Sequence, residues 1–185
     1  MDPHVFSWIV YGGWVLLVLY LTVAGLRAKR DTEPDLGQSF GLMYALLLAI
    51  ALPYVPLFSF VNYAPVGTAL SIVGLAVFFV GMAVFVVARQ ELGRNWSQTV
   101  STKQQQELVT AGPYHVVRHP MYAGGVVMCL GSAIVVGGPF LCLLFTLVPI
   151  FLWRVGAEDK LLTHEFPRQY PGYMQHTRAL IPFVW

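Results

Sequence analysis

The sequence predicts an all-α integral membrane protein, a bundle of five transmembrane helices in which the fourth and fifth form a helix-turn-helix hairpin. Three observations support this fold class. Of the 185 residues, 57% are hydrophobic and 11% are charged, whereas soluble domains carry roughly 25% charged residues. The uncharged runs match the roughly 20 residues that a helix needs to cross a bilayer. All eleven Lys and Arg residues lie in alternate connections between those runs.

The uncharged runs place the five spans in order. Residues 5–26 form the first span. Residues 36–88 hold no charged side chain, and the turn-forming sequence NYAP at 62–65 divides them into a second and a third span. Residues 120–153 are again uncharged, and Gly-Gly-Pro at 137–139 predicts a turn between two short arms, the fourth and fifth spans. The whole chain fits a single domain.

The charge pattern also predicts the orientation. By the positive-inside rule, the N-terminus lies outside, and the C-terminus and the functional face lie in the cytoplasm. The first apolar run has no basic segment before it, which favours a retained helix over a signal peptide. A net charge of +2 is ordinary for such a protein and does not indicate nucleic-acid binding. Cys129 and Cys142 lie inside predicted spans without metal-ligand spacing, so we expect no metal site.

Two polar segments bracket the predicted hairpin. Before it stands the sequence RHPMYAG at 118–124, in which Pro120 suits the first turn of a helix. Arg118 and His119 would then flank a helix start, which favours binding of a carboxylate or phosphate. After the hairpin, Arg154 and Glu158 stand one helical turn apart and share a face. Because both arms meet the same membrane surface, we expect the two segments to converge in one pocket.

Each of these features also has a plain structural interpretation. Arg118 and His119 could reach lipid headgroups with their polar tips, and Arg154 and Glu158 could form a local ion pair. Trp96 is interpreted as an anchor at headgroup level, in preference to a residue that lines a path to the site. The tail from residue 155 predicts a helix on the membrane surface, followed by an irregular segment or lid.

Together, these segments resemble the isoprenylcysteine carboxyl methyltransferase family, which is related to phospholipid methyltransferases. The resemblance rests on LGRNWS at 92–97, LVTAGPY at 108–114, RHPMYAG at 118–124, and Arg154 followed by Glu158 and Asp159. It covers residues 89–185. It implies a catalytic region there, whose C-terminal segment covers the cofactor. The three N-terminal membrane helices expected in residues 1–88 rest on the uncharged runs and match the family only in being hydrophobic.

The resemblance further implies S-adenosylmethionine as cofactor and a lipid-like methyl acceptor that enters from the bilayer. The acceptor group would be the carboxylate of an isoprenylated cysteine or of a similar lipid-tailed molecule, held by Arg154. The expected catalytic residues are Arg154, Arg118 and Glu158, with the role of Arg118 left open between catalytic and structural. The residues expected to line the cofactor are Gln106, Glu107, Leu108, Val109, Tyr114, His119, Pro120, Met121, Tyr122 and Glu158.

Two other functions remain open. A membrane reductase of the sterol-reductase type, which uses NADPH, has a similar hairpin region with an Arg-His pair. The chain lacks the glycine-rich fingerprint of dinucleotide binding, which argues against it. A non-enzymatic scaffold or transport subunit would carry polar residues deep inside its spans, and these spans hold almost none. Membrane lipids are expected as surroundings in every case.

Overall fold

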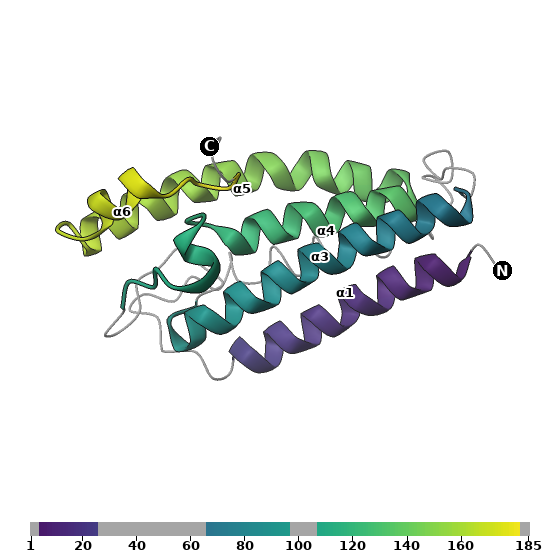
Figure 1. The fold of residues 1–185 in the computed structure, drawn as a ribbon, viewed down its shortest axis with the longest axis horizontal. Coiled ribbons are helices and arrows are strands. Elements are labelled where there is room, and N and C mark those ends of the chain that lie inside the picture. The colour runs from purple at the N-terminus through teal and green to yellow at the C-terminus, as the bar shows by residue number, and fades with distance from the viewer. Residues whose placement is uncertain (1–3, 26–65, 97–106, 182–185) are drawn as a thin grey trace.

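The computed structural model describes residues 4–25, 66–96 and 107–181 (Figure 1). Within these ranges the protein is helical and contains no strand. The helices are α1 (His4–Gly25), α3 (Thr68–Leu92), α4 (Pro120–Val136), α5 (Gly138–Glu165) and the short α6 (Tyr170–His176). Two short 3-10 helices, η3 (Gly93–Asn95) and η4 (Gly112–His115), lie between α3 and α4 along the chain.

Three of the described helices are long and apolar enough to cross a membrane, namely α1 over His4–Ala24, α3 and α5. The expected first and third spans correspond to α1 and α3. Helix α4 has 17 residues and is shorter than these three. The expected second span falls within residues 26–65, outside the described part of the chain. The described part of this membrane protein is therefore all-helical, and the count of five spans stays a prediction.

Gly137 separates α4 from α5. Its φ of 93° lies in the left-handed region, which glycine adopts without a steric penalty. Pro139 follows in the first turn of α5, where a missing N–H is no loss. Figure 1 shows α4 and α5 running side by side from this point. Helix α5 then continues without interruption to Glu165. The separate surface helix expected from residue 155 is therefore wrong, because that stretch extends the last transmembrane helix.

Helices α3 and α4 approach each other backbone to backbone. A Cβ atom added to Gly131 would stand 2.4 Å from the backbone nitrogen of Phe78, and one added to Gly81 would stand 2.5 Å from that of Met128. Such close contact between membrane helices requires small residues at the crossing. The α3–α4 pair is thus the rigid centre of the bundle, and it fixes where α4 begins.

Helix α1 packs on this pair through Trp14. The buried indole N–H of Trp14 donates to the Ser132 hydroxyl at 3.0 Å, and its ring stacks on Phe140 with centroids 6.1 Å apart. At the far end of α1, Arg89 of α3 donates from Nη2 to the Ala24 carbonyl at 3.2 Å. The C-terminal ends of α1 and α3 therefore lie at the same end of the bundle, where Figure 1 also places the start of α4 and all of α6.

Trp96 lies at this end of the bundle, against Arg89. The guanidinium carbon of Arg89 is 4.3 Å from the centroid of the Trp96 ring, a cation–π contact. Trp96 is 7% exposed and belongs to the hydrophobic core. The expected role of Trp96 as a headgroup anchor is therefore wrong, because its indole faces the protein interior.

Candidate active site

Two segments far apart in sequence lie side by side at the polar end of the bundle. Val117 and Arg178 form an isolated parallel β-bridge. The backbone N–H groups of Arg118 and His119 donate to the carbonyls of Arg178 at 2.7 Å and Ala179 at 3.0 Å. Because Pro120 begins α4 immediately afterwards, these bonds hold the N-terminal end of α4 against the C-terminal tail.

The N-terminal end of α4 also contacts α5, as expected from the two polar segments that bracket the α4–α5 turn. Arg118 Nη2 is 3.2 Å from Asp159 Oδ2. His119 lies between two carboxylates, with Nε2 2.9 Å from Asp159 Oδ1 and Nδ1 3.3 Å from Glu158 Oε2. The hydroxyl of Tyr122, in the first turn of α4, donates to Glu158 Oε1. The two polar segments that bracket the α4–α5 turn therefore form one cluster.

Arg154 enters this cluster through Tyr122. Its Nε donates to the Tyr122 hydroxyl at 3.0 Å, and its Nη2 is 3.6 Å from Glu158 Oε1. The local ion pair between Arg154 and Glu158 is thus present, but a tyrosine from another helix bonds to both partners. The Tyr122 ring stacks on Phe151, with centroids 4.8 Å apart, and on His119 at 5.8 Å. Tyr122 is consequently fixed through its ring as well as its hydroxyl.

The cluster is close to electrical balance. It contains two guanidiniums, Arg118 and Arg154, and two carboxylates, Glu158 and Asp159, so its formal charge is set by His119. Burial alone lowers the pKa of His119, but hydrogen bonds to Asp159 and Glu158 outweigh it and raise the pKa above the ordinary 6.5. An imidazolium supplies the two N–H donors that the flanking carboxylates require. The side chain of Glu158 is 23% exposed and that of Asp159 is 15% exposed.

Two tyrosines of α6 complete the site from the tail. Tyr170 donates its hydroxyl to Asp159 Oδ1 at 2.5 Å, and Tyr173 donates to the Tyr114 carbonyl at 2.6 Å. Burial raises the pKa of both phenols, that of Tyr173 to about 12. Both hydroxyls therefore remain protonated donors at neutral pH, and they tie α6 to α5 and to η4.

The structure places the expected cofactor-lining residues unevenly. His119, Tyr122 and Glu158 meet in the cluster, and Pro120 is fully buried at the start of α4. Tyr114 is buried in η4. Met121 packs against the hydrophobic core. No described side-chain contact joins the other three described residues to the cluster: Leu108 and Val109 are half-buried and Glu107 is exposed. Gln106 lies outside the described residues.

Two parts of the cluster, Asp159 and Tyr170, do not follow from the sequence pattern. Asp159 was identified only as the second acidic position of a family pattern, yet it contacts Arg118, His119 and Tyr170. Tyr170 lies in the tail for which the sequence predicts a surface helix and an irregular segment. Its neighbours Pro171 and Gly172 suggest irregular structure, so only the folded position of α6 reveals that its hydroxyl faces Asp159.

Comparison with known proteins places this site in a family. The sequence pattern of the isoprenylcysteine carboxyl methyltransferase (ICMT) family matches residues 72–164, which is half of the chain. A probable protein-S-isoprenylcysteine O-methyltransferase of Oryza sativa subsp. indica is 28% identical, over 89% of this chain and 88% of the relative. Protein-S-isoprenylcysteine O-methyltransferase of Schizosaccharomyces pombe is 33% identical, over 52% of this chain and 43% of the relative.

A solved structure supports the same fold. The eukaryotic intramembrane Ras methyltransferase ICMT matches 83% of this chain with a TM-score of 0.60 and 23% sequence identity. The match covers 55% of the solved chain, so the present chain spans about half the length of that enzyme. The family match extends from α3 to the end of α5 and includes both polar segments of the cluster. The chain therefore belongs to the isoprenylcysteine carboxyl methyltransferase family and is an integral membrane methyltransferase.

Proposed function

We propose that this protein transfers a methyl group from S-adenosylmethionine to the carboxylate of an isoprenylated cysteine or a similar lipid-tailed molecule. The observation that carries the proposal is the contact of Tyr122, Arg154 and Glu158 where α4 begins and α5 emerges, in a chain of this family. The names of the relatives support the acceptor class. We place the active site on the cytoplasmic face, within residues 89–185 of a single domain.

The residues of the cluster fit the proposed methyl donor chemically. S-adenosylmethionine carries an ammonium group, a carboxylate, ribose hydroxyls and a sulfonium. Glu158, the more exposed of the two carboxylates, would accept hydrogen bonds from the ammonium or ribose. His119 would pair with the carboxylate of the cofactor. The ring of Tyr114 would face the sulfonium, because the Tyr122 ring already stacks on Phe151 and His119. A nearly balanced cluster presents no net repulsion to such a ligand.

Methyl transfer to an ionised carboxylate requires few catalytic groups from the protein. When bound, S-adenosylmethionine supplies a methyl carbon that bonds to the acceptor oxygen while the carbon–sulfur bond breaks and its electron pair passes to sulfur. An ionised carboxylate needs no general base. The protein therefore acts by alignment and by excluding water. Arg154 would hold the acceptor carboxylate, and Tyr122, which bonds Arg154 Nε, would orient that guanidinium.

The contacts of Arg118 support a structural role for this residue. Its Nη1 donates to the Thr177 carbonyl at 2.6 Å, and its Nη2 is 3.2 Å from Asp159. These bonds tie the entrance of α4 to the tail and to α5. A guanidinium engaged in this way stabilises the pocket and does not need to touch the acceptor.

Ligand binding tests the proposal directly. Purified protein should bind S-adenosylhomocysteine and should not bind NADPH. Glu158→Ala should abolish the binding of S-adenosylhomocysteine. Glu165→Ala is the matched control, because Glu165 ends α5 outside the cluster. Binding of NADPH alone would favour the reductase, and normal binding by Glu158→Ala would remove the role given to Glu158.

The acceptor is tested with a pair of synthetic substrates. An N-acetylated isoprenylcysteine with a free carboxylate should accept labelled methyl from S-adenosylmethionine and release it as methanol in base. The matching carboxamide should not react, because it has no ionised oxygen. Equal labelling of both compounds, or base-stable label, would show that the acceptor atom is not a carboxylate oxygen.

A further inference from the structure

We propose that Tyr170 is a positioning residue of the methyltransferase site. It fixes Asp159 and His119, and through them Glu158, so that the docking of α6 sets the geometry in which the methyl donor binds. This inference rests on the proposed function, since it assigns to the tail a part in donor binding.

Asp159 has both of its carboxylate oxygens occupied by protein groups. Oδ1 faces His119 Nε2 at 2.9 Å and accepts from the Tyr170 hydroxyl at 2.5 Å. Oδ2 accepts from Arg118 Nη2 at 3.2 Å. These three donors come from two segments, the stretch before α4 and the start of α6, and they fix the orientation of Asp159, which is also less exposed than Glu158. We therefore assign Asp159 a supporting role and not direct contact with the methyl donor.

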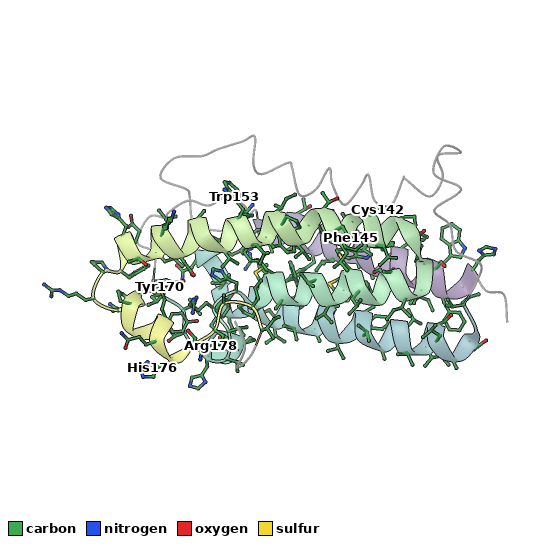
Figure 2. The ribbon with its side chains drawn as sticks, turned by 90° about the horizontal axis from the view of Figure 1, so that it is seen from above. Cys142, Phe145, Trp153, Tyr170, His176 and Arg178 are labelled. Atoms are coloured by element: carbon green, nitrogen blue, oxygen red, sulfur yellow. The ribbon has the colours of Figure 1, made fainter. Side chains whose placement is uncertain are left out.

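Tyr170 is the residue of the C-terminal tail that donates a hydrogen bond to the Asp159 carboxylate. It is 1% exposed and begins α6. Figure 2 shows Tyr170 on the side of α6 that faces α5, whereas His176, near the other end of α6, lies on the outer side. A buried phenol needs a partner for its hydroxyl. Asp159 is that partner, so the seating of α6 and the orientation of Asp159 depend on the same bond.

His119 carries this constraint to Glu158. Its ring is buried, with Nε2 facing Asp159 and Nδ1 3.3 Å from Glu158 Oε2. The ring also stacks on Tyr122, whose hydroxyl donates to the other oxygen of Glu158. If Asp159 turns away, the His119 ring loses the acceptor that sets its rotation. Glu158 then loses one of the two groups that orient it from the α4 side.

A double-mutant cycle tests this path by S-adenosylhomocysteine affinity. Tyr170→Phe keeps the ring and removes the hydroxyl, and we expect about tenfold weaker binding, in the range of a lost hydrogen bond to a charged group. When His119→Gln is already present, adding Tyr170→Phe should weaken binding by less than a further factor of about two. Both substitutions interrupt the same chain of contacts from Tyr170 through Asp159 and His119 to Glu158, so their effects should not add. Tyr173→Phe is the matched control, since it removes an α6 hydroxyl bonded to Tyr114. Its effect should be the same in both backgrounds.

Two outcomes would overturn the inference. One is wild-type affinity in Tyr170→Phe, and the other is a full tenfold loss from Tyr170→Phe in the His119→Gln background. Should Tyr170→Phe not fold, Asp159→Asn takes its place. NMR should then show a lower pKa for His119, because the ring has lost a charged acceptor, and an unchanged pKa would contradict the path.

A second measurement separates this inference from the proposed function. In protein with ¹⁵N-labelled histidine, the Nε2–H proton of His119 is identified by its absence from His119→Gln. We expect this proton to exchange slowly in wild type and in Tyr173→Phe, and at least about tenfold faster in Tyr170→Phe. If wild type fails to bind S-adenosylhomocysteine, the proposed function fails, and the exchange rates still decide the positioning role. Equal rates in all three proteins would refute it.

Discussion

At the scale of single residues, the site is a group of charges that neutralise one another. Arg118 pairs with Asp159, and Arg154 pairs with Glu158. His119 lies between the two carboxylates. Removing one member of a buried pair leaves the other uncompensated, and the resulting destabilisation is larger than the net value of the pair. Conservative substitutions therefore complement truncations such as Glu158→Ala.

Arg154→Lys should separate donor binding from turnover. A lysine keeps the positive charge beside Glu158, so we expect S-adenosylhomocysteine affinity within about twofold of wild type. It cannot form the two parallel hydrogen bonds of a guanidinium with a carboxylate, so kcat should fall roughly 10- to 100-fold. Calorimetry and a methyl-transfer assay measure the two quantities. Arg168→Lys, at an exposed position between α5 and α6, should change neither, and a parallel loss of affinity in Arg154→Lys would contradict the role.

His119 should make stability depend on pH. Its pKa is raised in the folded protein, so the protonated ring stabilises the fold fully below about pH 6.5. This contribution should decline as the pH rises through the folded pKa. Thermal unfolding in detergent should show a falling Tm above about pH 6.5, and His119→Gln should flatten this slope. A wild-type slope retained in His119→Gln would assign the effect to another group.

At the scale of the elements, the contact between α3 and α4 determines where the cluster can form. Gly81 and Gly131 allow the two backbones to touch, and α4 begins at the cluster with Pro120. Dispersion contacts between closely packed backbones, not hydrophobic burial, hold membrane helices together. A shift of α4 by a few tenths of an ångström would be transmitted along the helix to Tyr122.

Gly131→Ala and Gly125→Ala form a matched pair within α4. A Cβ at Gly131 would meet backbone atoms of Phe78 at 2.4 Å, whereas one at Gly125 would meet the Phe151 ring at 3.5 Å, an ordinary contact. We expect Gly131→Ala to destabilise the protein by about 1–3 kcal/mol. Gly125→Ala should be neutral or stabilising by up to about 1 kcal/mol, from helix propensity. Unfolding in mixed micelles measures both, and equal effects would show that the close approach is not limiting.

At the scale of the whole molecule, every Lys and Arg of the described residues lies at or beyond the same end of the bundle (Figure 1). Arg89 lies in the last turn of α3 and Arg94 in η3, which follows it. Arg118 precedes α4, and the others follow from Arg154 onward. The opposite end carries the start of α3 and the turn at Gly137. This segregation has the form that the positive-inside rule describes, and the rule predicts that the basic end faces the cytoplasm.

Cysteine labelling tests the orientation. Thr68→Cys and Gln175→Cys are exposed positions at opposite ends of the bundle, to be introduced after replacing Cys129 and Cys142 with alanine. In intact cells, a membrane-impermeant maleimide should label Thr68→Cys alone. After permeabilisation it should label both. Labelling of Gln175→Cys in intact cells would reverse the predicted orientation and place the active site outside.

The sequence was sufficient where the physical signal is local. Uncharged runs specify membrane helices because a charge in hydrocarbon is costly, and they located α1 and α3. Pro120 marked the start of α4, and Gly137 with Pro139 marked the turn to α5. The i,i+4 spacing placed Arg154 and Glu158 on one face. These features depend only on residues that are close together in the chain.

Only the tertiary structure decided which groups complete the cluster. Tyr170 reaches Asp159 because α5 continues as one helix and the chain then folds back as α6. Arg118 reaches the Thr177 carbonyl across 59 positions of sequence, and Trp96 turns inward because Arg89 offers a cation to its ring. Polar side chains at a membrane boundary can face lipid headgroups or one another at similar intrinsic cost. The choice depends on how distant helices pack, which no local pattern encodes.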